Sequence, residues 1–368
     1  MKRPQANPWI KLIPPYAPGL SKEQIARRHG ITAPIKLASN ENPLGPSRLA
    51  LKAIDALKGT VHLYPDAAAG ELRQAAAEYF LCEPENIIAG NGSDEIIDMV
   101  CRAFLAPGDK VVIPECTFSY YRIAALACGA EVIRVPMDGM HIDASAIENA
   151  LTGKEHIKLV FLANPNNPTG TYLDRETIGR LIAGLPDGTL LIIDEAYAAF
   201  ARAADFASAA PLINAHPNIV VINTLSKSHG LAGLRVGFGL AEQSIIDILG
   251  RVKPPFNLNL LAIKAGTAAL SDSSFVQETL ALTWNSLNYL ERECSRLGLT
   301  FVPSQTNFVL IHIGLAARRV YEELLQRGII TRYLTEPGLA EYLRISIGLP
   351  YENETLVANL ENILAKIQ

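Results

Sequence analysis

Short apolar runs alternate with longer stretches of helical periodicity between about residues 85 and 250. Most of the runs are continuously apolar, which is typical of strands covered on both faces of a sheet. The stretch from 96 to 104 places its apolar residues on one helical face, after Ser93 and Asp94, which suit a helix N-terminus. This rhythm predicts an α/β domain with a mostly parallel sheet flanked by helices. The predicted strands are residues 87–89, 111–113, 132–135, 159–162, 190–193 and 219–222.

The pattern changes near Pro254 and Pro255. A helical stretch follows at about 258–297, and strands at 307–311 and 343–347 then alternate with helices at 316–326 and 352–367. A chain of 368 residues exceeds what one hydrophobic core usually supports. We therefore predict an N-terminal arm (1–34), a large ligand-binding domain (35–253) and a smaller α+β domain (254–368).

Composition narrows the function classes. The 33 basic and 37 acidic residues give a net charge of −4 without any block of like charge, so neither nucleic acid nor a membrane surface is an expected partner. No apolar run has signal-peptide or membrane-spanning length. Five cysteines, never spaced as CxxC, favour reduced thiols in the cytoplasm, and seven histidines without HxxxH spacing predict no metal site.

Two predicted strands end in residues of distinct chemistry. Asp194 follows the run 190–193, and the segment TLSKSHGLAGLRVG (224–237) with Lys227 and Arg235 follows the run 219–222. Ligands of parallel sheets bind beyond the carboxyl ends of the strands. A lysine that can form a Schiff base, an acid that can hold a ring nitrogen protonated and an arginine for a phosphate suit a phosphorylated aldehyde cofactor. Considered alone, the lysine is an ordinary solvated charge.

Two loops suit this hypothesis, although each has a simpler interpretation. GNGSDE (90–95) can present backbone N–H groups and a helix N-terminus to an anion, or it is an ordinary strand-to-helix turn. It lacks the third glycine of a dinucleotide fingerprint, and the chain has no GxxxxGK phosphate loop. NPNNPTG (164–170) forms a rigid turn that can present Asn167 at a strand end.

Single residues add little on their own. Tyr64 and Phe118 are by themselves core or surface aromatics. Arg344 lies within the apolar run YLRISIG, where a charge is costly to bury unless it is paired. It therefore predicts a carboxylate partner, supplied either by the protein itself or by a substrate.

Taken together, the motifs resemble one family. SNENPLG, YPD, GNGSDE, NPNNPTG, DEAY, TLSKSHGLAGLRVG and LRISIG occur in the order and spacing of class I and II aminotransferases of the type I pyridoxal-phosphate fold, over essentially the whole chain. PPYAPG, SNENPLGPS, GNGSDEII and the short length are most similar to the histidinol-phosphate aminotransferase subgroup. Aromatic aminotransferases share most of these motifs.

The resemblance implies a pyridoxal 5'-phosphate site. Lys227 would form the Schiff base and Asp194 would pair with the pyridine nitrogen. Asn167 and Tyr197 would hydrogen-bond the phenolic oxygen, and Phe118 would stack on the ring. Many relatives have tyrosine where Phe118 stands, so stacking is expected here without a hydroxyl contact. The residues implied for the phosphate are Gly92, Ser93, Asp94, Thr224, Ser226 and Arg235.

The resemblance also implies a homodimer, because Tyr64 would reach the phosphate in the neighbouring subunit. Arg344 would bind the glutamate carboxylate by two hydrogen bonds. The same arginine, with Arg332 and Tyr16, would receive the substrate phosphate. The residues implied for substrate binding are Tyr16, Asn42, Tyr64, Asn167, Arg332 and Arg344.

The implied reaction is amino transfer between L-histidinol phosphate and 2-oxoglutarate, with Lys227, Asp194 and Tyr197 as catalytic residues. An aromatic aminotransferase and a pyridoxal-phosphate-dependent amino-acid phosphate decarboxylase remain alternatives. A non-enzymatic binding module is disfavoured by the intact Lys227, Asp194, Asn167 and Arg235. The run TRYLTEPGLAEY (331–342) departs from the usual family pattern, with tyrosine at 333 and no YG pair.

Overall fold

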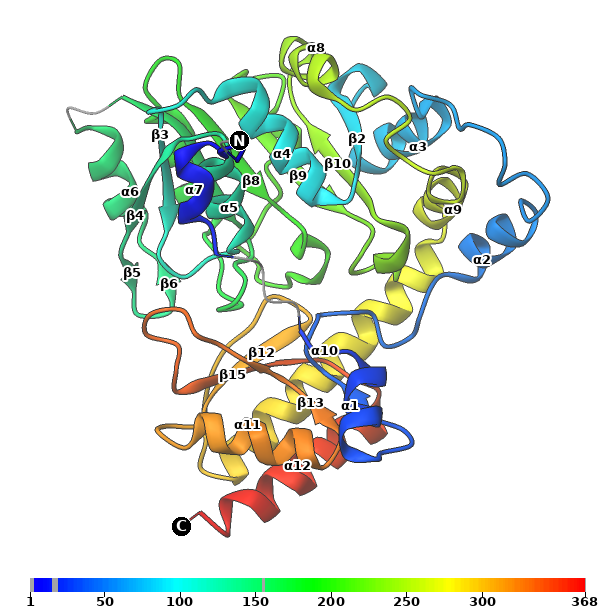
Figure 1. Cartoon of the computed structure of the whole chain (residues 1–368), viewed down its shortest axis with the longest axis vertical. Coiled ribbons are helices and arrows are strands. Elements are labelled where there is room, and N and C mark those ends of the chain that lie inside the picture. Colours follow the sequence, from blue (N-terminus) through cyan, green and yellow to red (C-terminus); the bar gives the residue numbers. More distant parts are fainter. Residues whose placement is uncertain (1–2, 15–18, 154–155, 368) are drawn as a thin grey trace.

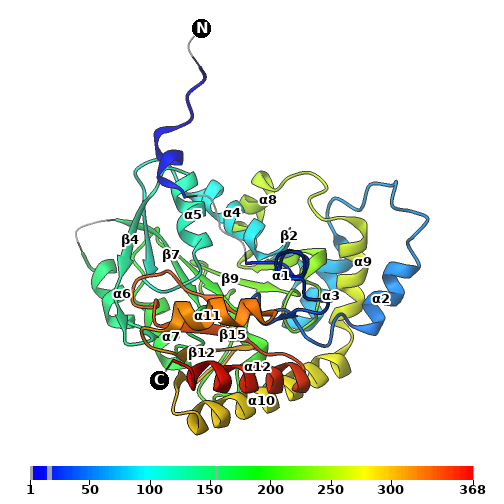
Figure 2. The same ribbon diagram turned by 60° about the horizontal axis from the view of Figure 1, so that its bottom comes forward.

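A computed structural model describes residues 3–14, 19–153 and 156–367. A seven-stranded sheet with its helices forms the upper part in Figure 1, and a four-stranded sheet with its helices forms the lower part. Helix α10 (Ser273–Arg296) runs from one part into the other. In Figure 2, α10 and α12 (Pro350–Leu364) lie side by side. No helix in these described ranges is long and apolar enough to cross a membrane.

The large sheet contains all six predicted strands and one more. The additional strand, β10, is antiparallel to both of its neighbours, whereas the other pairs are parallel. Its sequence, VGFGL, alternates apolar residues with glycine and so lacks a continuous apolar run. The predicted mostly parallel sheet is confirmed. The strand order is β2 (Ile87–Asn91), β10 (Val236–Leu240), β9 (Ile219–Thr224), β8 (Leu190–Asp194), β7 (Ile157–Ala163), β3 (Lys110–Pro114), β4 (Glu131–Val135).

Helices cover both faces of this sheet, which explains the continuous apolar runs. One face packs against α4 (Ser93–Phe104), α5 (Tyr120–Ala127) and α8 (Gln243–Val252). In β3, Val112 faces one core while Val111 and Ile113 face the other. The helices of the second face are α3 (Gly70–Phe80), α6 (Ala144–Leu151), α7 (Arg175–Ala183) and α9 (Leu260–Leu270). A short hairpin joins β5 (Met137–Asp138) to β6 (His141–Ile142).

The second part is built on an antiparallel sheet of four strands. Its strands, in order, are β11 (Thr300–Val302), β12 (Phe308–His312), β15 (Tyr342–Ser346) and β14 (Arg332–Tyr333). A core of buried residues joins this sheet to α10, α11 (Ala317–Gln326) and α12. The strands and helices predicted for this region are present. The single helical stretch predicted at 258–297 was wrong, since Asp272 caps a new helix, α10, by accepting a hydrogen bond from the backbone N–H of Phe275 (3.3 Å).

Two segments pack differently from the predicted division at residues 34 and 253. Helix α9 follows residue 253 but packs on α2 (Arg48–Asp55) and α3 of the larger part. Strand β1 (Ile35–Lys36) pairs with β13 (Ile329–Ile330) of the smaller part, and Ile25 of α1 (Lys22–His29) is buried beside it. The described start of the chain also contains a short 3-10 helix, Pro8–Leu12. The predicted division stays a prediction.

Glycine at position 237 allows β10 to pass against the turn before α4. A Cβ there would lie 2.4 Å from both the carbonyl carbon of Gly92 and the backbone nitrogen of Ser93. We expect Gly237→Ala to lower the free energy of unfolding by about 1–3 kcal/mol, because backbone atoms would have to move. Urea denaturation measures the change.

Gly250→Ala in α8 is the matched control, since a Cβ there would meet nothing within 4 Å. We expect this substitution to raise the free energy of unfolding by roughly 0.5–1 kcal/mol, because alanine loses less conformational freedom than glycine in a helix. Equal effects of the two substitutions would contradict the packing argument.

Candidate active site

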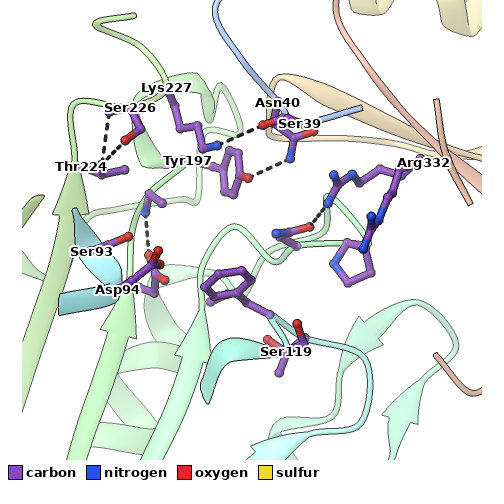
Figure 3. Close-up of a pocket in the computed structure, with 18 of the residues that line it drawn as sticks. Ser39, Asn40, Ser93, Asp94, Ser119, Tyr197, Thr224, Ser226, Lys227 and Arg332 are labelled. Atoms are coloured by element: carbon purple, nitrogen blue, oxygen red, sulfur yellow. Dashed lines mark hydrogen bonds between the residues drawn. The ribbon is translucent and has the colours of Figure 1, made fainter. Parts of the chain in front are cut away.

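A cavity of about 250 Å3 lies beyond the carboxyl ends of β7, β8 and β9, between the two parts of the chain. Figure 3 shows its lining side chains. Twelve of the sequence-predicted site residues line it together: Ser93, Asp94, Phe118, Asn167, Asp194, Tyr197, Thr224, Ser226, Lys227, Arg235, Arg332 and Arg344. They come from segments far apart in the sequence, so the fold brings the predicted chemistry into one place.

Four predicted residues are placed differently. Gly92 does not line the cavity itself but lies against Arg235, which does. A Cβ on Gly92 would lie 2.3 Å from the Arg235 Nη2 atom. Asn42 points away from it and donates from Nδ2 to the Ser228 carbonyl (3.1 Å) and to Thr279 Oγ1 (3.0 Å). Tyr64 is 82% exposed outside the cavity. Tyr16 lies outside the described residues.

One end of the cavity is built to receive an anion. Helix α4 begins there after Gly92, whose φ of 84° and lack of a side-chain cap leave the first backbone N–H groups available. Arg235 donates from Nη2 to Asp94 Oδ2 (2.9 Å) and from Nη1 to Ser226 Oγ (3.4 Å). The Thr224 hydroxyl donates to Ser226 Oγ (3.0 Å). A helix N-terminus, two hydroxyls and a guanidinium together favour a doubly charged group such as a phosphate.

Asp194 ends β8 at the floor of the cavity. The carboxylate is buried and accepts hydrogen bonds from the Tyr121 hydroxyl (2.7 Å) and the Ala196 backbone N–H (3.0 Å). Burial raises the pKa of Asp194 to about 6, because desolvation outweighs these two hydrogen bonds. A cation beside it would restore the ionised form, so the site suits a protonated ring nitrogen.

The neighbouring acid, Glu195, faces the other way. Its carboxylate accepts from Ser208 Oγ (2.5 Å) and from the Ala209 backbone N–H (2.6 Å), and it does not line the cavity. Burial raises the pKa of Glu195 to about 7. Two adjacent acids therefore differ in role, because successive residues of an extended segment point to opposite sides.

Lys227 presents a primary amine in the middle of the cavity (Figure 3). Its Nζ donates to the Ser39 carbonyl (3.3 Å) and lies 5.8 Å from the centre of the Tyr197 ring. The Tyr197 hydroxyl accepts from Asn40 Nδ2 (2.8 Å). Within the described part of the chain, no carboxylate lies within ion-pair distance of the lysine, so the amine is available for chemistry with a carbonyl group.

The opposite side of the cavity carries two arginines from the smaller part. Arg332 lies across the cavity from Ser93 and Asp94 in Figure 3. Arg344 donates from Nη1 to Asn167 Oδ1 (2.6 Å) and from Nη2 to the Ala38 carbonyl (2.7 Å). Both of these acceptors are neutral oxygens. This side therefore suits an anionic part of a substrate.

Several lining residues were not predicted as site residues: Ser39, Asn40, Ser119, Tyr121 and Glu336. Asn40 stands within the SNENPLG motif, so its position was already marked. Tyr121 was not recognised as a site residue, because its ring is part of the apolar core and stacks on Phe161 with centroids 4.9 Å apart. No group of three or more His, Cys, Asp or Glu side chains in the described ranges could hold a metal ion.

The family model for aminotransferase class I and II matches residues 32–360. The chain belongs to this family. Among curated aminotransferases, histidinol-phosphate aminotransferase from an Anaeromyxobacter species is 41% identical over 98% of this chain and 99% of its own length. The protein of the same name from Halalkalibacterium halodurans is 40% identical over 98% of this chain and 97% of its own.

A solved aminotransferase structure agrees with the fold. Histidinol-phosphate aminotransferase from Sinorhizobium meliloti, crystallised with pyridoxal 5'-phosphate, superposes with a TM-score of 0.93 at 28% identity. The match covers 100% of this chain and 99% of that one. The predicted fold class is therefore confirmed over the whole aminotransferase chain.

The hydrogen bond from Tyr121 holds down the pKa of the Asp194 carboxyl. We expect Tyr121→Phe to raise this pKa above its value of about 6 in the protein without cofactor, because the charged form loses a donor. Infrared difference spectra of the protonated carboxyl band, assigned with Asp194→Asn, measure the midpoint. Tyr120→Phe is the control, since that hydroxyl donates to Asp98 Oδ2 (2.9 Å). An unchanged midpoint in Tyr121→Phe would refute the coupling.

Proposed function

We propose that this aminotransferase transfers the amino group of L-histidinol phosphate to 2-oxoglutarate with pyridoxal 5'-phosphate as cofactor. The products are imidazole-acetol phosphate and glutamate, a step of histidine biosynthesis. The observation that carries the proposal is one cavity that unites Lys227, a buried acid and an anion cradle with two further arginines. The names and full-length similarity of the curated relatives support the choice of substrate.

The residues present fit the cofactor. Asp194 is a buried carboxyl whose raised pKa calls for a cationic partner, and a Cβ on Gly92 would fill the cradle formed with Arg235. Ser93, Thr224 and Ser226 would complete the hold on the phosphate. When bound, pyridoxal phosphate supplies an electron-accepting ring that stabilises negative charge on the carbon bearing the amino group.

Side chains of this protein supply the remaining chemistry. The Lys227 amine lies within the cavity and acts as the general base for the Cα proton of the substrate. Asp194 keeps the ring nitrogen protonated. Tyr197, held by Asn40, and Asn167 would donate to the phenolic oxygen, and Phe118 would cover the ring. The phenylalanine packs against Tyr121 with centroids 5.5 Å apart, which fixes its position.

Arg344 and Arg332 serve both half-reactions. Each half-reaction brings an anion to this side, since glutamate carries a carboxylate and histidinol phosphate carries a phosphate. A guanidinium forms two parallel hydrogen bonds with either group. We assign Arg344 to the carboxylate, with Arg332 beside it on the substrate side.

We also propose a cytoplasmic homodimer. Large apolar side chains are exposed on α2, on the segment that follows it and beside α9: Leu49, Leu51, Val61, Leu63, Tyr64 and Phe256. An apolar patch of this kind is typical of a protein interface. Tyr64 packs against Phe256 with ring centroids 4.7 Å apart and would reach the phosphate of the partner's cofactor. All five cysteines are free, which supports a reducing compartment.

A panel of single half-reactions tests the proposed substrate. The holoenzyme is mixed separately with histidinol phosphate, phenylalanine, tyrosine and aspartate, and the change in cofactor absorbance is followed. We expect the highest kcat/KM with histidinol phosphate and recovery of the starting spectrum with 2-oxoglutarate. Lys227→Ala is expected to abolish turnover, since it removes the base.

The alternatives predict different outcomes from this panel. A large preference for phenylalanine would replace the proposal with an aromatic aminotransferase. Release of carbon dioxide without any need for 2-oxoglutarate would indicate a decarboxylase. Activity of Lys227→Ala within tenfold of the wild type would refute the mechanism.

Tyr64→Phe tests the contact across the dimer. We expect cofactor affinity to fall about 10- to 100-fold, because the phosphate loses a charge-assisted hydrogen bond while the apolar ring keeps the dimer intact. Fluorescence titration measures the affinity, and ultracentrifugation checks the dimer. Tyr351→Phe is the control, since that side chain is exposed at the start of α12. Unchanged cofactor affinity in a dimeric Tyr64→Phe protein would exclude the contact.

A further inference from the structure

An acidic side chain, Glu336, lines the cavity on the substrate side. It lies in the run 331–342, where the sequence departs from the usual family pattern, and two nearby residues of this run, Arg332 and Leu334, line the same cavity. Its Oε2 atom accepts a hydrogen bond from the Thr335 backbone N–H (3.0 Å). None of the roles assigned above to the cofactor site uses this carboxylate.

The segment that carries Glu336 is fastened to the protein on both sides. Leu334 and Leu339 are buried in a small core with Cys116, Val302 and Leu310. The Cys116 thiol donates to the Pro337 carbonyl (3.3 Å). Cys116 is followed closely by Phe118 and Ser119, which also line the cavity. Glu336 therefore lines the cavity from a segment that is anchored on both sides.

The charges around Glu336 show what it would recognise. An acid here repels a second carboxylate and attracts an N–H donor or a cation. Asp94 already has Arg235 as its partner (2.9 Å), whereas no basic side chain of the described ranges lies within ion-pair distance of Glu336. The charged residues that line the same cavity are Asp94, Asp194, Lys227, Arg235, Arg332 and Arg344.

We infer that Glu336 is a specificity-determining residue that accepts a hydrogen bond from an imidazole N–H of the amino donor. An imidazole offers N–H donors and has a pKa near 6.5, so part of it is cationic at neutral pH. A phenyl ring offers this carboxylate no donor. The inference rests on the proposed function, since it explains how this cavity would distinguish an imidazole substrate from an aromatic one.

Two substitutions test this inference in the holoenzyme. Glu336→Ala removes the acceptor, and we expect kcat/KM for histidinol phosphate to fall about 10- to 100-fold, mainly through KM, since a charge-assisted hydrogen bond is lost. Glu336→Gln keeps an oxygen acceptor but removes the charge, so we expect a smaller loss. With phenylalanine, both variants are expected to match or exceed the wild type.

Glu341→Gln is the matched control, since that acid pairs with His312 (2.9 Å) away from the cavity. We expect it to leave both substrates unaffected. Equal losses with histidinol phosphate and phenylalanine, or no loss with either, would overturn the inference. Failure of the proposed function has a different signature, because the wild type itself would then show no preference for histidinol phosphate. If Glu336→Ala does not fold, Glu336→Gln still decides the question.

Discussion

The buried carboxylate of Asp194 is the interaction on which the site depends. An ionised acid in a water-poor interior costs several kcal/mol unless it is paired or hydrogen-bonded. Here it ends a strand covered on both faces, and two donors only partly compensate for its burial. The ring of Tyr121, whose hydroxyl is one of these donors, stacks on Phe161. The fold therefore holds an acid that is incomplete until a cation arrives, which is the condition that a protonated pyridine satisfies.

The cavity lies where the two parts of the chain meet, and each part supplies a different function. The larger part contributes the anion cradle, Asp194 and Lys227, while the smaller part contributes Arg332 and Arg344. A hydrogen bond joins the parts at the site: Arg344 of the smaller part donates from Nη1 to Asn167 Oδ1 of the larger part (2.6 Å). A change at Arg344 would therefore also reach Asn167, which is proposed to contact the cofactor.

Much of this arrangement could be predicted from sequence because the relevant signals are local. Continuous apolar runs marked the strands, and the polar residues after two of them marked the site. Strand β10 was missed because its glycines, required by close approach to the turn at Gly92, interrupt the apolar pattern. Tyr121 and Glu336 were missed because their roles arise from contacts between distant segments. The break between α9 and α10 depends on a cap at Asp272 inside a nearly continuous helical pattern.

The electrostatics of the cavity differ from those of the whole chain. The net charge of the chain is −4, yet the side chains that line the described cavity include Lys227, Arg235, Arg332 and Arg344 against Asp94, Asp194 and Glu336. The carboxylate of Asp94 is occupied by Arg235, and burial disfavours the charge of Asp194. Basic side chains therefore stand at both ends of the cavity, Arg235 at one end and Arg332 and Arg344 at the other. This arrangement draws anions into a cleft of an otherwise acidic protein. It favours a phosphorylated cofactor at one end and an anionic substrate at the other, while a single acid beside the second end can still select among the anions that enter.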